Sequence, residues 1–512
     1  MKKVIYCYIT DKHIKKIVDF LYEKHSWKPL IFLNRSEANS EISKYYKKSI
    51  FLDKMKLRKG EFDYSFIKEK IPVGEDVLNN LSRYEYTYLE WLQDTSGWNF
   101  SITERKRYFH EMLNYWNSVI NSKKPDLFVS YTVPHMPEDY ALYLICKYHY
   151  KIPTIFLDIY PHFNKNYFSI HGNLENLSET YIHEYNSERS NKISQDINNY
   201  IEKLIKDPKT PIHITEYIDY HKNIIKKQNI FQDLKHIMYL LLKGKVFKEA
   251  PVAFKKSKKP FLKSQLNNLE YFFFLKNIKK RNRELSKIYN KYIEKINNND
   301  IFVYFAAPYQ PEIYSNLAPG NFKDVFLILD ILTNTLPKGW KIYYKEHPNT
   351  FNEGDYAALT KDKHYYKKIK NYKNVVFISS SENSFNLIEK SKAVITTGGT
   401  VGMEATIKNK PVLLFGNHWY SGCKSVFNIL NYKDAKNAFI KIKDGYKPNQ
   451  QDVKKYIQSI YNCSFKNDLN LESYKLKQGK KNNSESFLDN HFYNIGKNFF
   501  NAYIRLYEKK IF

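Results

Sequence analysis

The chain has 512 residues and carries 82 Lys and Arg against 53 Asp and Glu, a formal net charge of +29. This length predicts more than one domain, and a content of 43% hydrophobic and 17% aromatic residues excludes a disordered chain. The charge alone is weak support for a nucleic-acid partner, because Lys, Asn, Ile, Tyr and Phe are all abundant, as an AT-rich genome would also produce.

Export and membrane-spanning signals are not expected. The apolar run Val4–Ile9 is followed at once by Asp11 and Lys12, so it is too short for a signal peptide. No run reaches the ~20 apolar residues of a membrane span. The four cysteines are far apart and form no CxxC pair, which argues against a disulfide scaffold or a structural zinc site. We therefore expect a cytoplasmic protein, peripheral to the inner face of the cell membrane if it contacts a membrane at all.

The N-terminal part, residues 1–204, alternates apolar runs with helical patterns. Such spacing predicts parallel strands joined by helices, hence a Rossmann-like domain. The segment from about 50 to 125 is mostly helical and aromatic in pattern. The predicted strands are Val4–Ile9, Pro29–Leu33, Asp126–Tyr131 and Pro153–Ile159, and the clearest helices are Lys12–Glu23 and Pro137–Tyr150.

Residues 205–298 differ in composition and are predicted to form a basic helical connector or insertion. Within them, residues 241–290 contain fourteen Lys or Arg and three Glu, with Phe and Leu interleaved. This pattern fits either a solvated basic face or a surface that docks on anionic lipid or on a polyanionic acceptor.

The strand–helix alternation returns after residue 298. Residues 299–483 are predicted to form a second Rossmann-like domain, and residues 484–512 are predicted to form helices that pack back toward the N-terminal domain. The five candidate strands are Ile301–Phe305, Lys341–Lys345, Val375–Ile378, Ala393–Thr396 and Val412–Phe415.

The strongest motif is the glycine-rich turn in Ala393–Phe415. A strand ends at Thr396 and Thr397, the chain turns, and a helix begins near Val401. Paired glycines allow close backbone approach, and a helix start offers free N–H groups to a phosphate. An ordinary strand–helix turn with a solvated Glu404 remains the alternative. The candidate residues are Thr397, Gly398, Gly399 and Thr400 for the phosphate and Glu404 for a ribose or sugar hydroxyl.

Three further polar clusters follow predicted strands of the same sheet. Since ligands bind at the carboxyl ends of parallel strands, these clusters should converge on one crevice. The serines could instead cap the next helix, and a lone histidine is usually structural. The clusters are Gln310 with Glu312, then Lys345, His347 and Pro348, then Ser379, Ser380 and Ser381.

A comparable loop joins Asp126–Tyr131 to the next helix in the N-terminal part. His135, with Glu138 or Asp139, could activate an acceptor hydroxyl there. The alternative is that both carboxylates only stabilise the first turn of the helix. Asp158 is a weaker candidate. Together with Glu312, the candidate bases are His135 and Glu138.

The C-terminal motifs resemble the bacterial capsule and surface polysaccharide biosynthesis proteins, which include the Kdo transferases. The resemblance covers residues 300–420 well, covers 125–165 loosely and does not extend to 205–295. The His-Pro and Ser clusters are also similar to motifs of bacterial sialyl- and polysialyltransferases. The motifs are Gln310-Pro311-Glu312, Lys345-Glu346-His347-Pro348, Thr396-Thr397-Gly398-Gly399-Thr400-Val401-Gly402-Met403-Glu404, and Lys410-Pro411 before Phe415-Gly416.

The resemblance implies a GT-B glycosyltransferase, in which two Rossmann-like domains face a cleft and the C-terminal one holds a nucleotide-sugar. It implies that His347 and Ser379–Ser381 contact the donor phosphate, that Thr397–Thr400 lie near the nucleotide and that Glu404 lies near its ribose. It also implies catalysis without a metal or resident cofactor, often from a CMP-activated acidic sugar. The expected partners are this donor, a polysaccharide or lipid-linked acceptor and an anionic membrane surface, with no nucleic acid.

Two alternatives remain open. A nucleotide-sugar epimerase or a glycerophosphate-type polymerase could use the same fold. A basic nucleic-acid-binding protein would need a recognisable binding module, and the sequence contains none of the usual signatures.

Overall fold

The protein divides into two compact α/β units. The structure is a computed structural model, and it describes residues 1–92, 101–160, 167–206, 238–239, 242–243, 268–310, 319–351, 360–466 and 485–508. Unit 1 comprises Met1–Thr180 together with Cys463–Phe512, and unit 2 comprises Tyr181–Asn462. The predicted boundaries were 204, 298 and 483, so the observed division differs: residues 181–204 and the described part of the connector group with the second unit.

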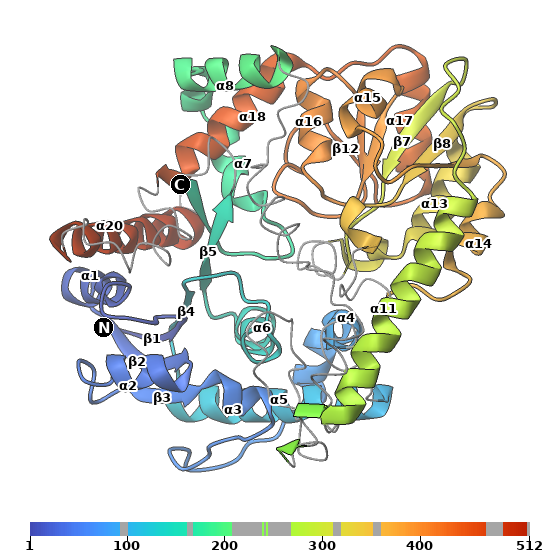
Figure 1. Cartoon of the computed structure of the whole chain (residues 1–512). Helices are drawn as coiled ribbons and strands as arrows, with labels where there is room; N and C mark the ends of the chain where they lie inside the picture. Colours follow the sequence, from blue (N-terminus) through green and yellow to red (C-terminus); the bar gives the residue numbers. More distant parts are fainter. Residues whose placement is uncertain are drawn as a thin grey trace. The chain divides into compact units, whose positions relative to one another are not determined.

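Unit 1 contains a mostly parallel sheet in the order β13-β6-β5-β4-β1-β2-β3 (Figure 1). The chain starts in the middle with β1, adds β2 and β3 on one side and β4 and β5 on the other, all parallel. β6 and β13 then extend the edge in antiparallel pairs. The strands are β1 (Lys2–Cys7), β2 (Trp27–Asn34), β3 (Ile50–Asp53), β4 (Leu127–Ser130), β5 (Thr154–Tyr160), β6 (Tyr167–His171) and β13 (Phe465–Lys466).

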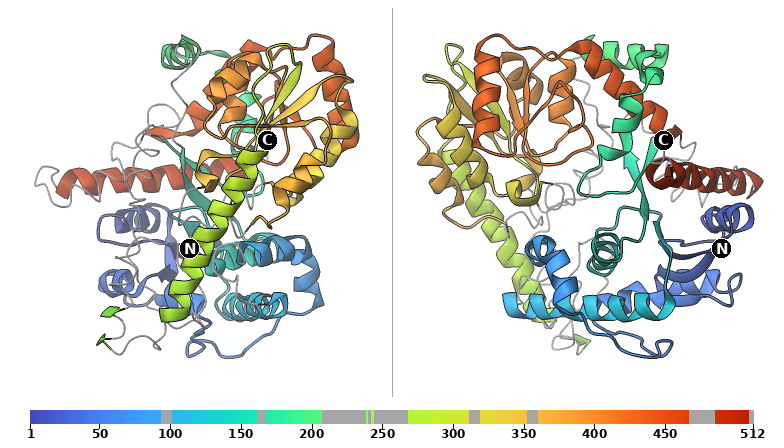
Figure 2. Two further views of the ribbon diagram at one scale, coloured as in Figure 1. Left: turned by 45° about the vertical axis from the view of Figure 1, so that its right-hand side comes forward. Right: turned by 180° about the vertical axis from the view of Figure 1, so that it is seen from behind.

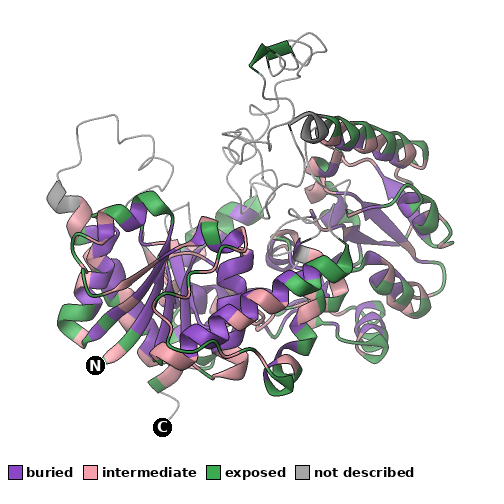
Figure 3. Ribbon diagram, turned by 90° about the horizontal axis from the view of Figure 1, so that it is seen from below, coloured by how far each residue is buried: buried purple, intermediate pink, exposed green. Residues whose placement is uncertain are grey.

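Helices cover this sheet, and the buried strands lie between them (Figure 3). α1 and α20 lie side by side in both views of Figure 2, although they come from opposite ends of the chain. The helices are α1 (Lys15–His25), α2 (Ser36–Ile42), α3 (Lys54–Arg58), α4 (Glu75–Leu92), α5 (Ile102–Lys123), α6 (Pro137–Leu144), α7 (Glu179–Tyr185, which crosses the boundary) and α20 (Glu485–Tyr503).

Unit 2 contains a parallel sheet in the order β12-β11-β10-β7-β8-β9. The chain starts in the middle at β7, builds outward through β8 and β9, and returns to β10 on the other side of β7. This is the strand order of a doubly wound Rossmann sheet. The strands are β7 (Phe302–Ala306), β8 (Lys341–Lys345), β9 (Val375–Ile378), β10 (Val394–Thr396), β11 (Val412–Leu414) and β12 (Phe427–Asn428).

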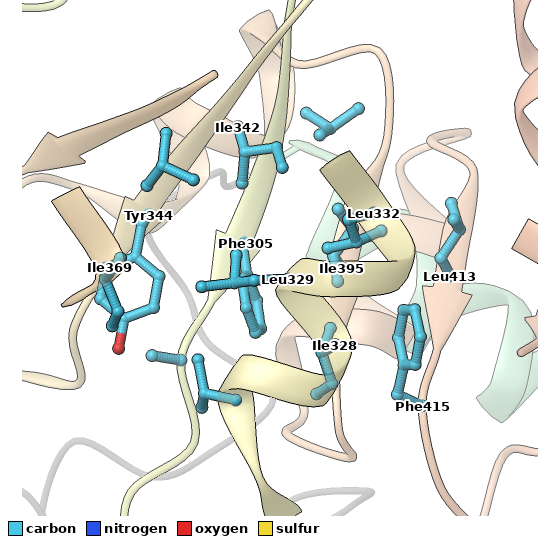
Figure 4. Packing of buried hydrophobic residues seen from close by; sticks show 14 of the residues in the cluster. Phe305, Ile328, Leu329, Leu332, Ile342, Tyr344, Ile369, Ile395, Leu413 and Phe415 are labelled. Atoms are coloured by element: carbon cyan, nitrogen blue, oxygen red, sulfur yellow. The ribbon is translucent and has the colours of Figure 1, made fainter. Parts of the chain in front are cut away.

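The core of unit 2 forms where helices pack on this sheet. Figure 4 shows Ile328, Leu329 and Leu332 of α13 directed at strand residues such as Phe305 and Ile395, all of them buried. The helices are α8 (Gln195–Lys206), α11 (Asn268–Lys291), α13 (Val325–Thr335), α14 (Tyr365–Lys370), α15 (Ser384–Lys390), α16 (Val401–Ile407), α17 (Tyr432–Lys443) and α18 (Gln450–Cys463).

The predicted α/β class with two Rossmann-like domains is confirmed. The expected strands all appear, and Lys341–Lys345 and Val375–Ile378 match to the residue. β1 ends at Cys7 rather than Ile9, because Tyr8 has a φ of 66° that breaks the extended backbone. Half of the basic stretch 241–290 lies outside the described residues, but α11 at its end is no detached connector, since Leu285 and Tyr289 belong to the unit 2 core.

The C-terminal helix should be essential to unit 1. Phe499 on α20 is fully buried in the unit 1 core. We expect Phe499→Ala to lower the free energy of unfolding by about 3–5 kcal/mol, because it leaves a cavity. The exposed Asn501 on the same helix provides the control. Asn501→Ala should change the free energy of unfolding by less than about 0.5 kcal/mol. Denaturant titration measures both, and equal effects would contradict the packing.

Candidate functional site

Unit 2 places its polar loops at one edge of one sheet. The strand order reverses between β7 and β10, and the crevice beyond such a reversal is where open α/β sheets bind ligands. Residue Gln310 follows β7 and the Thr397–Thr400 turn follows β10. The His347 loop follows β8 and the Ser379–Ser381 loop follows β9. The predicted convergence of these segments at the carboxyl edge therefore follows from the topology.

His347 is half-buried in the loop after β8. Its Nδ1 accepts the backbone N–H of Asn349 at 3.2 Å, so the neutral ring carries its proton on Nε2. Burial lowers the pKa of His347 to about 4, and the charges of Lys345 and Lys361 act in the same direction. Near pH 7 the ring is thus a neutral donor through Nε2, and its centre lies 5.1 Å from that of the Tyr309 ring, to which it is tilted by 38°. Pro348 follows it and begins a short helical turn.

Glu346, directly before His347, anchors this loop. Its side chain is completely buried, and its two oxygens accept hydrogen bonds from Tyr366 Oη at 2.9 Å, from Tyr344 Oη at 3.2 Å and from Thr350 Oγ1 at 3.2 Å. Lys361 Nζ lies 3.9 Å away as its counter-charge. A buried carboxylate needs this degree of satisfaction, so Glu346 fixes the backbone from which His347 projects.

Lys345, the last residue of β8, supplies a buried cation. Its Nζ donates to Ser384 Oγ at 3.0 Å. Burial lowers the pKa of Lys345 to about 8, against the opposing influence of Glu382 and Glu346. An ammonium group with few acceptors in a desolvated position is suited to attract a phosphate.

The serine cluster after β9 forms a turn and does not cap the next helix. Ser379 Oγ and Ser381 Oγ are 2.8 Å apart, and Ser379 Oγ accepts the Ser381 N–H at 3.3 Å. The cap of α15 is Asn383, whose Oδ1 accepts the Phe385 N–H at 2.8 Å. The capping alternative for the serines is therefore wrong. Ser380 lies half-buried in the same turn.

The turn after β10 is folded around Thr396. Its Oγ1 accepts the N–H groups of Gly398 and Gly399, both at 3.2 Å. Gly398 has a φ of +144°, and a Cβ there would meet the ring of His418 at 2.6 Å. Thr397 is buried, whereas Thr400 is half-buried at the start of α16 and forms no side-chain cap. Glycine is thus required at position 398 by both conformation and space.

His418 and Tyr420 were not predicted from the sequence. Both are buried in the loop after β11, and their rings lie 4.9 Å apart. Tyr420 Oη donates to the Gly399 carbonyl at 2.8 Å, which braces the glycine turn. Burial raises the pKa of Tyr420, and the nearby Glu404 carboxylate, itself buried, adds to this. The carboxyl-end rule, applied to the strand Val412–Phe415, would have found this loop.

Two predicted residues next to β7 have different outcomes. Gln310 is buried, and its Nε2 donates to the Lys323 carbonyl at 3.1 Å, so it ties two loops together at the edge of the sheet. Glu312 lies outside the described residues. Its assignment as a base stays a prediction.

In unit 1, His135 is half-buried in the loop after β4. Its Nδ1 lies 2.6 Å from the Val133 carbonyl, which can only accept, so the ring proton is on Nδ1 and Nε2 is the basic atom. Burial lowers the pKa of His135, with the Val133 hydrogen bond opposing this. The ring is therefore in the tautomer that a general base requires.

Glu138 and Asp139 are deeply buried but are engaged differently. Both Glu138 oxygens accept from Arg58, at 2.9 Å from Nε and 2.5 Å from Nη2. Asp139 accepts the Met136 N–H at 2.7 Å and the Tyr8 hydroxyl. Burial raises the pKa of Asp139 to about 7, and the charge of Glu138 adds to this.

Tyr8, Lys54 and Arg58 were not singled out from the sequence. Lys54 is buried, with Nζ 3.7 Å from the centre of the Tyr8 ring, and burial lowers its pKa to about 8. These residues follow β1 and β3, so they share the carboxyl edge of the unit 1 sheet with His135. The charged cluster is larger than predicted.

The described ranges contain no candidate metal site and no candidate membrane span. Within them, no group of three or more His, Cys, Asp or Glu side chains could hold a metal ion. In the same part of the chain, no helix combines the length and the apolar character needed to cross a membrane.

Comparisons with known proteins identify one segment. Residues 274–424 match the family model described as capsule polysaccharide biosynthesis protein. This confirms the predicted resemblance over that segment and extends it back into α11, where none was expected. No curated protein sequence matches significantly.

Several solved structures are distantly similar. The beta Kdo 2,7 transferase KpsC of Thermosulfurimonas dismutans has 11% identity and a TM-score of 0.28, covering 66% of this chain and 78% of that one. The UDP-GlcNAc 2-epimerase of Neisseria meningitidis has 13% identity and a TM-score of 0.22, covering 90% and 99%. Similarities with TM-scores this low carry no argument about the fold, which follows from the strand order of this protein.

The glycine turn offers a test of local geometry. Gly398→Ala should lower the free energy of unfolding by about 1–3 kcal/mol or more, because a Cβ meets His418 in a strained conformation. Gly445 has a φ of +93° and open space around it, so Gly445→Ala incurs only the conformational part. Denaturant titration of both variants separates the two effects, and equal losses would contradict the close approach to His418.

Proposed function

We propose that the protein is a glycosyltransferase that moves a sugar from a nucleotide-sugar donor to a hydroxyl of a growing capsule or surface polysaccharide. The observation that supports this most is the gathering of polar loops after β7, β8, β9 and β10 at one edge of a Rossmann-type sheet. These loops lie within the segment that matches the capsule biosynthesis family. The match alone concerns capsule biosynthesis, and the reaction is our inference.

The donor nucleotide would be held by unit 2. His347 would donate from Nε2 to a phosphate oxygen, and Lys345 would add a positive charge beside it. The hydroxyls of Ser379–Ser381 and the backbone of Thr397–Thr400 would surround the same phosphate, with Glu404 near the ribose. Such fixed donors stabilise the negative charge that develops on the leaving nucleotide. On this proposal catalysis needs no metal, and a CMP-activated acidic sugar is the donor we favour.

The acceptor hydroxyl would be activated in unit 1. His135 Nε2 would take the hydroxyl proton as the new bond forms between the acceptor oxygen and the anomeric carbon. The bond from that carbon to the donor phosphate breaks, and the nucleotide leaves with the electron pair. Glu138 was also a candidate base, but its oxygens are both held by Arg58. We therefore assign Glu138 the role of positioning the loop.

The membrane contact expected of residues 241–290 stays a prediction, because half of these residues lie outside those described. Binding to anionic vesicles would test it. If present, it would place the enzyme at the inner face of the cell membrane.

A nucleotide screen tests the donor site. We expect CMP to raise the melting temperature more than UDP, GDP or CDP, because a ligand that binds only the native state stabilises it by mass action. His347→Ala should greatly reduce this rise, and it should abolish sugar transfer while the protein remains folded. The exposed His364 in the same unit gives the control His364→Ala, which should behave as wild type.

The screen has clear negative outcomes. No rise with any nucleotide would overturn the proposed function, and normal turnover by the His347→Ala protein would remove the role of His347. A sugar product that forms without acceptor would favour the epimerase alternative.

Lys345 predicts a pH dependence of nucleotide affinity. Its pKa is about 8, so the ammonium is charged below that pH and neutral above it. We expect CMP affinity to fall about tenfold between roughly pH 7 and pH 9, as the bound phosphate loses this charge. Lys345→Met should bind CMP more weakly and with little pH dependence, whereas the exposed-site control Lys390→Met should keep the wild-type profile. An unchanged profile in Lys345→Met would exclude a contact of this lysine with the phosphate.

A further inference from the structure

The hydroxyl of Tyr289 joins two loops of the candidate donor site. Tyr289 lies on α11 and is completely buried. Its Oη donates to the Ile378 carbonyl at 2.6 Å and accepts the Glu346 N–H at 2.9 Å. Ile378 is the last residue of β9 and Glu346 is the first after β8. The next residues in the chain are Ser379 and His347.

The Tyr289 hydroxyl lies where the pairing between β8 and β9 ends. β8 and β9 are in register up to Lys345 and Ile378, their last paired residues. Beyond this point the segment after β8 continues as the His347 loop, and the segment after β9 continues as the serine loop. The Tyr289 hydroxyl donates to the last carbonyl of β9 and accepts the first N–H after β8. It therefore links the two segments where the next hydrogen bond between the strands would lie.

The ring that carries this hydroxyl is fixed on several sides. Phe351, Tyr366 and Phe377 lie 5.2, 5.0 and 5.4 Å from it, centre to centre. Close packing of this kind restricts the ring, so the hydroxyl cannot follow one loop away from the other. α11 thus contributes to the edge of the site through one side chain, although it lies before the first strand of the sheet.

We propose that Tyr289 is a positioning residue that holds the His347 loop and the Ser379–Ser381 loop at the separation needed to contact one phosphate group. This inference rests on the proposed function. The alternative is that Tyr289 is an ordinary core residue that merely satisfies two buried backbone groups. The two differ in where the loss of the hydroxyl is felt.

Tyr289→Phe removes only the hydroxyl and leaves the ring packing in place. The matched control is Tyr343→Phe, because Tyr343 is also fully buried and its Oη donates to Asp300 Oδ2 at 2.7 Å. Tyr343 lies on β8, and Asp300 lies just before β7, at the amino edge of the same sheet. Both variants lose a hydrogen bond, but only the first lies beside the site.

Hydrogen exchange in the absence of nucleotide tests whether the Tyr289 hydroxyl holds the two loops in place. The useful amides are Asn349 and Thr350 in one loop and Ser381 and Glu382 in the other, because their hydrogen bonds are local to each loop. We expect Tyr289→Phe to speed exchange at all four about tenfold or more, with no change at Gly398 and Gly399. Faster exchange in one loop only, in neither, or equally throughout unit 2 would overturn the proposal, as would the same result in Tyr343→Phe.

CMP binding then tests the link to the site. We expect the Kd for CMP to rise about tenfold in Tyr289→Phe and less than about twofold in Tyr343→Phe. In the His347→Ala background, Tyr289→Phe should add little further, because residues that act as a unit are not additive. Fully additive losses would overturn the positioning role. If the wild-type protein binds no nucleotide, the proposed function fails. The exchange measurement still decides whether the Tyr289 hydroxyl holds the two loops together.

Discussion

The direction of the strands is the constraint on which the candidate site depends. In unit 2 the described strands are parallel, so each ends at the same edge and each leaves its following loop there. Residues as far apart in the chain as Gln310 and Gly398, 88 positions, are brought to one edge without any local sequence relationship. The central position of β7 then sets where the loops part to either side.

Burial of charge gives these loops their rigidity. Glu346 has no access to solvent, so its oxygens must be satisfied by Tyr344, Tyr366, Thr350 and Lys361. In unit 1, the buried carboxylate of Glu138 is likewise satisfied by Arg58. Such pairs contribute little net stability, because desolvation offsets the attraction. Their effect is to specify one arrangement of the backbone beside them, which is what a site for a charged ligand needs.

Much of the fold could be predicted because it is written in local patterns. Short apolar runs gave the strands, and the carboxyl-end rule placed His347, Ser379–Ser381 and Thr397–Thr400 at one edge. The rest depends on contacts that no local pattern contains. Arg58 meets Glu138 across eighty positions, and Tyr289 meets Ile378 across eighty-nine. The basic composition around α11 also hid the buried stripe of Leu285 and Tyr289, because long exposed lysines dominate the average of any window there.

The return of the chain to unit 1 through α20 affects the order in which the protein can fold during synthesis. A ribosome makes residues 1–180, then all of unit 2, and only afterwards the segment that contains Phe499. Until then the face of α1 that α20 covers has no partner, although unit 2 is already complete. Unit 2 can therefore reach its native state on the nascent chain while unit 1 waits with exposed apolar surface. In a cell, that interval is when this protein would most need a chaperone.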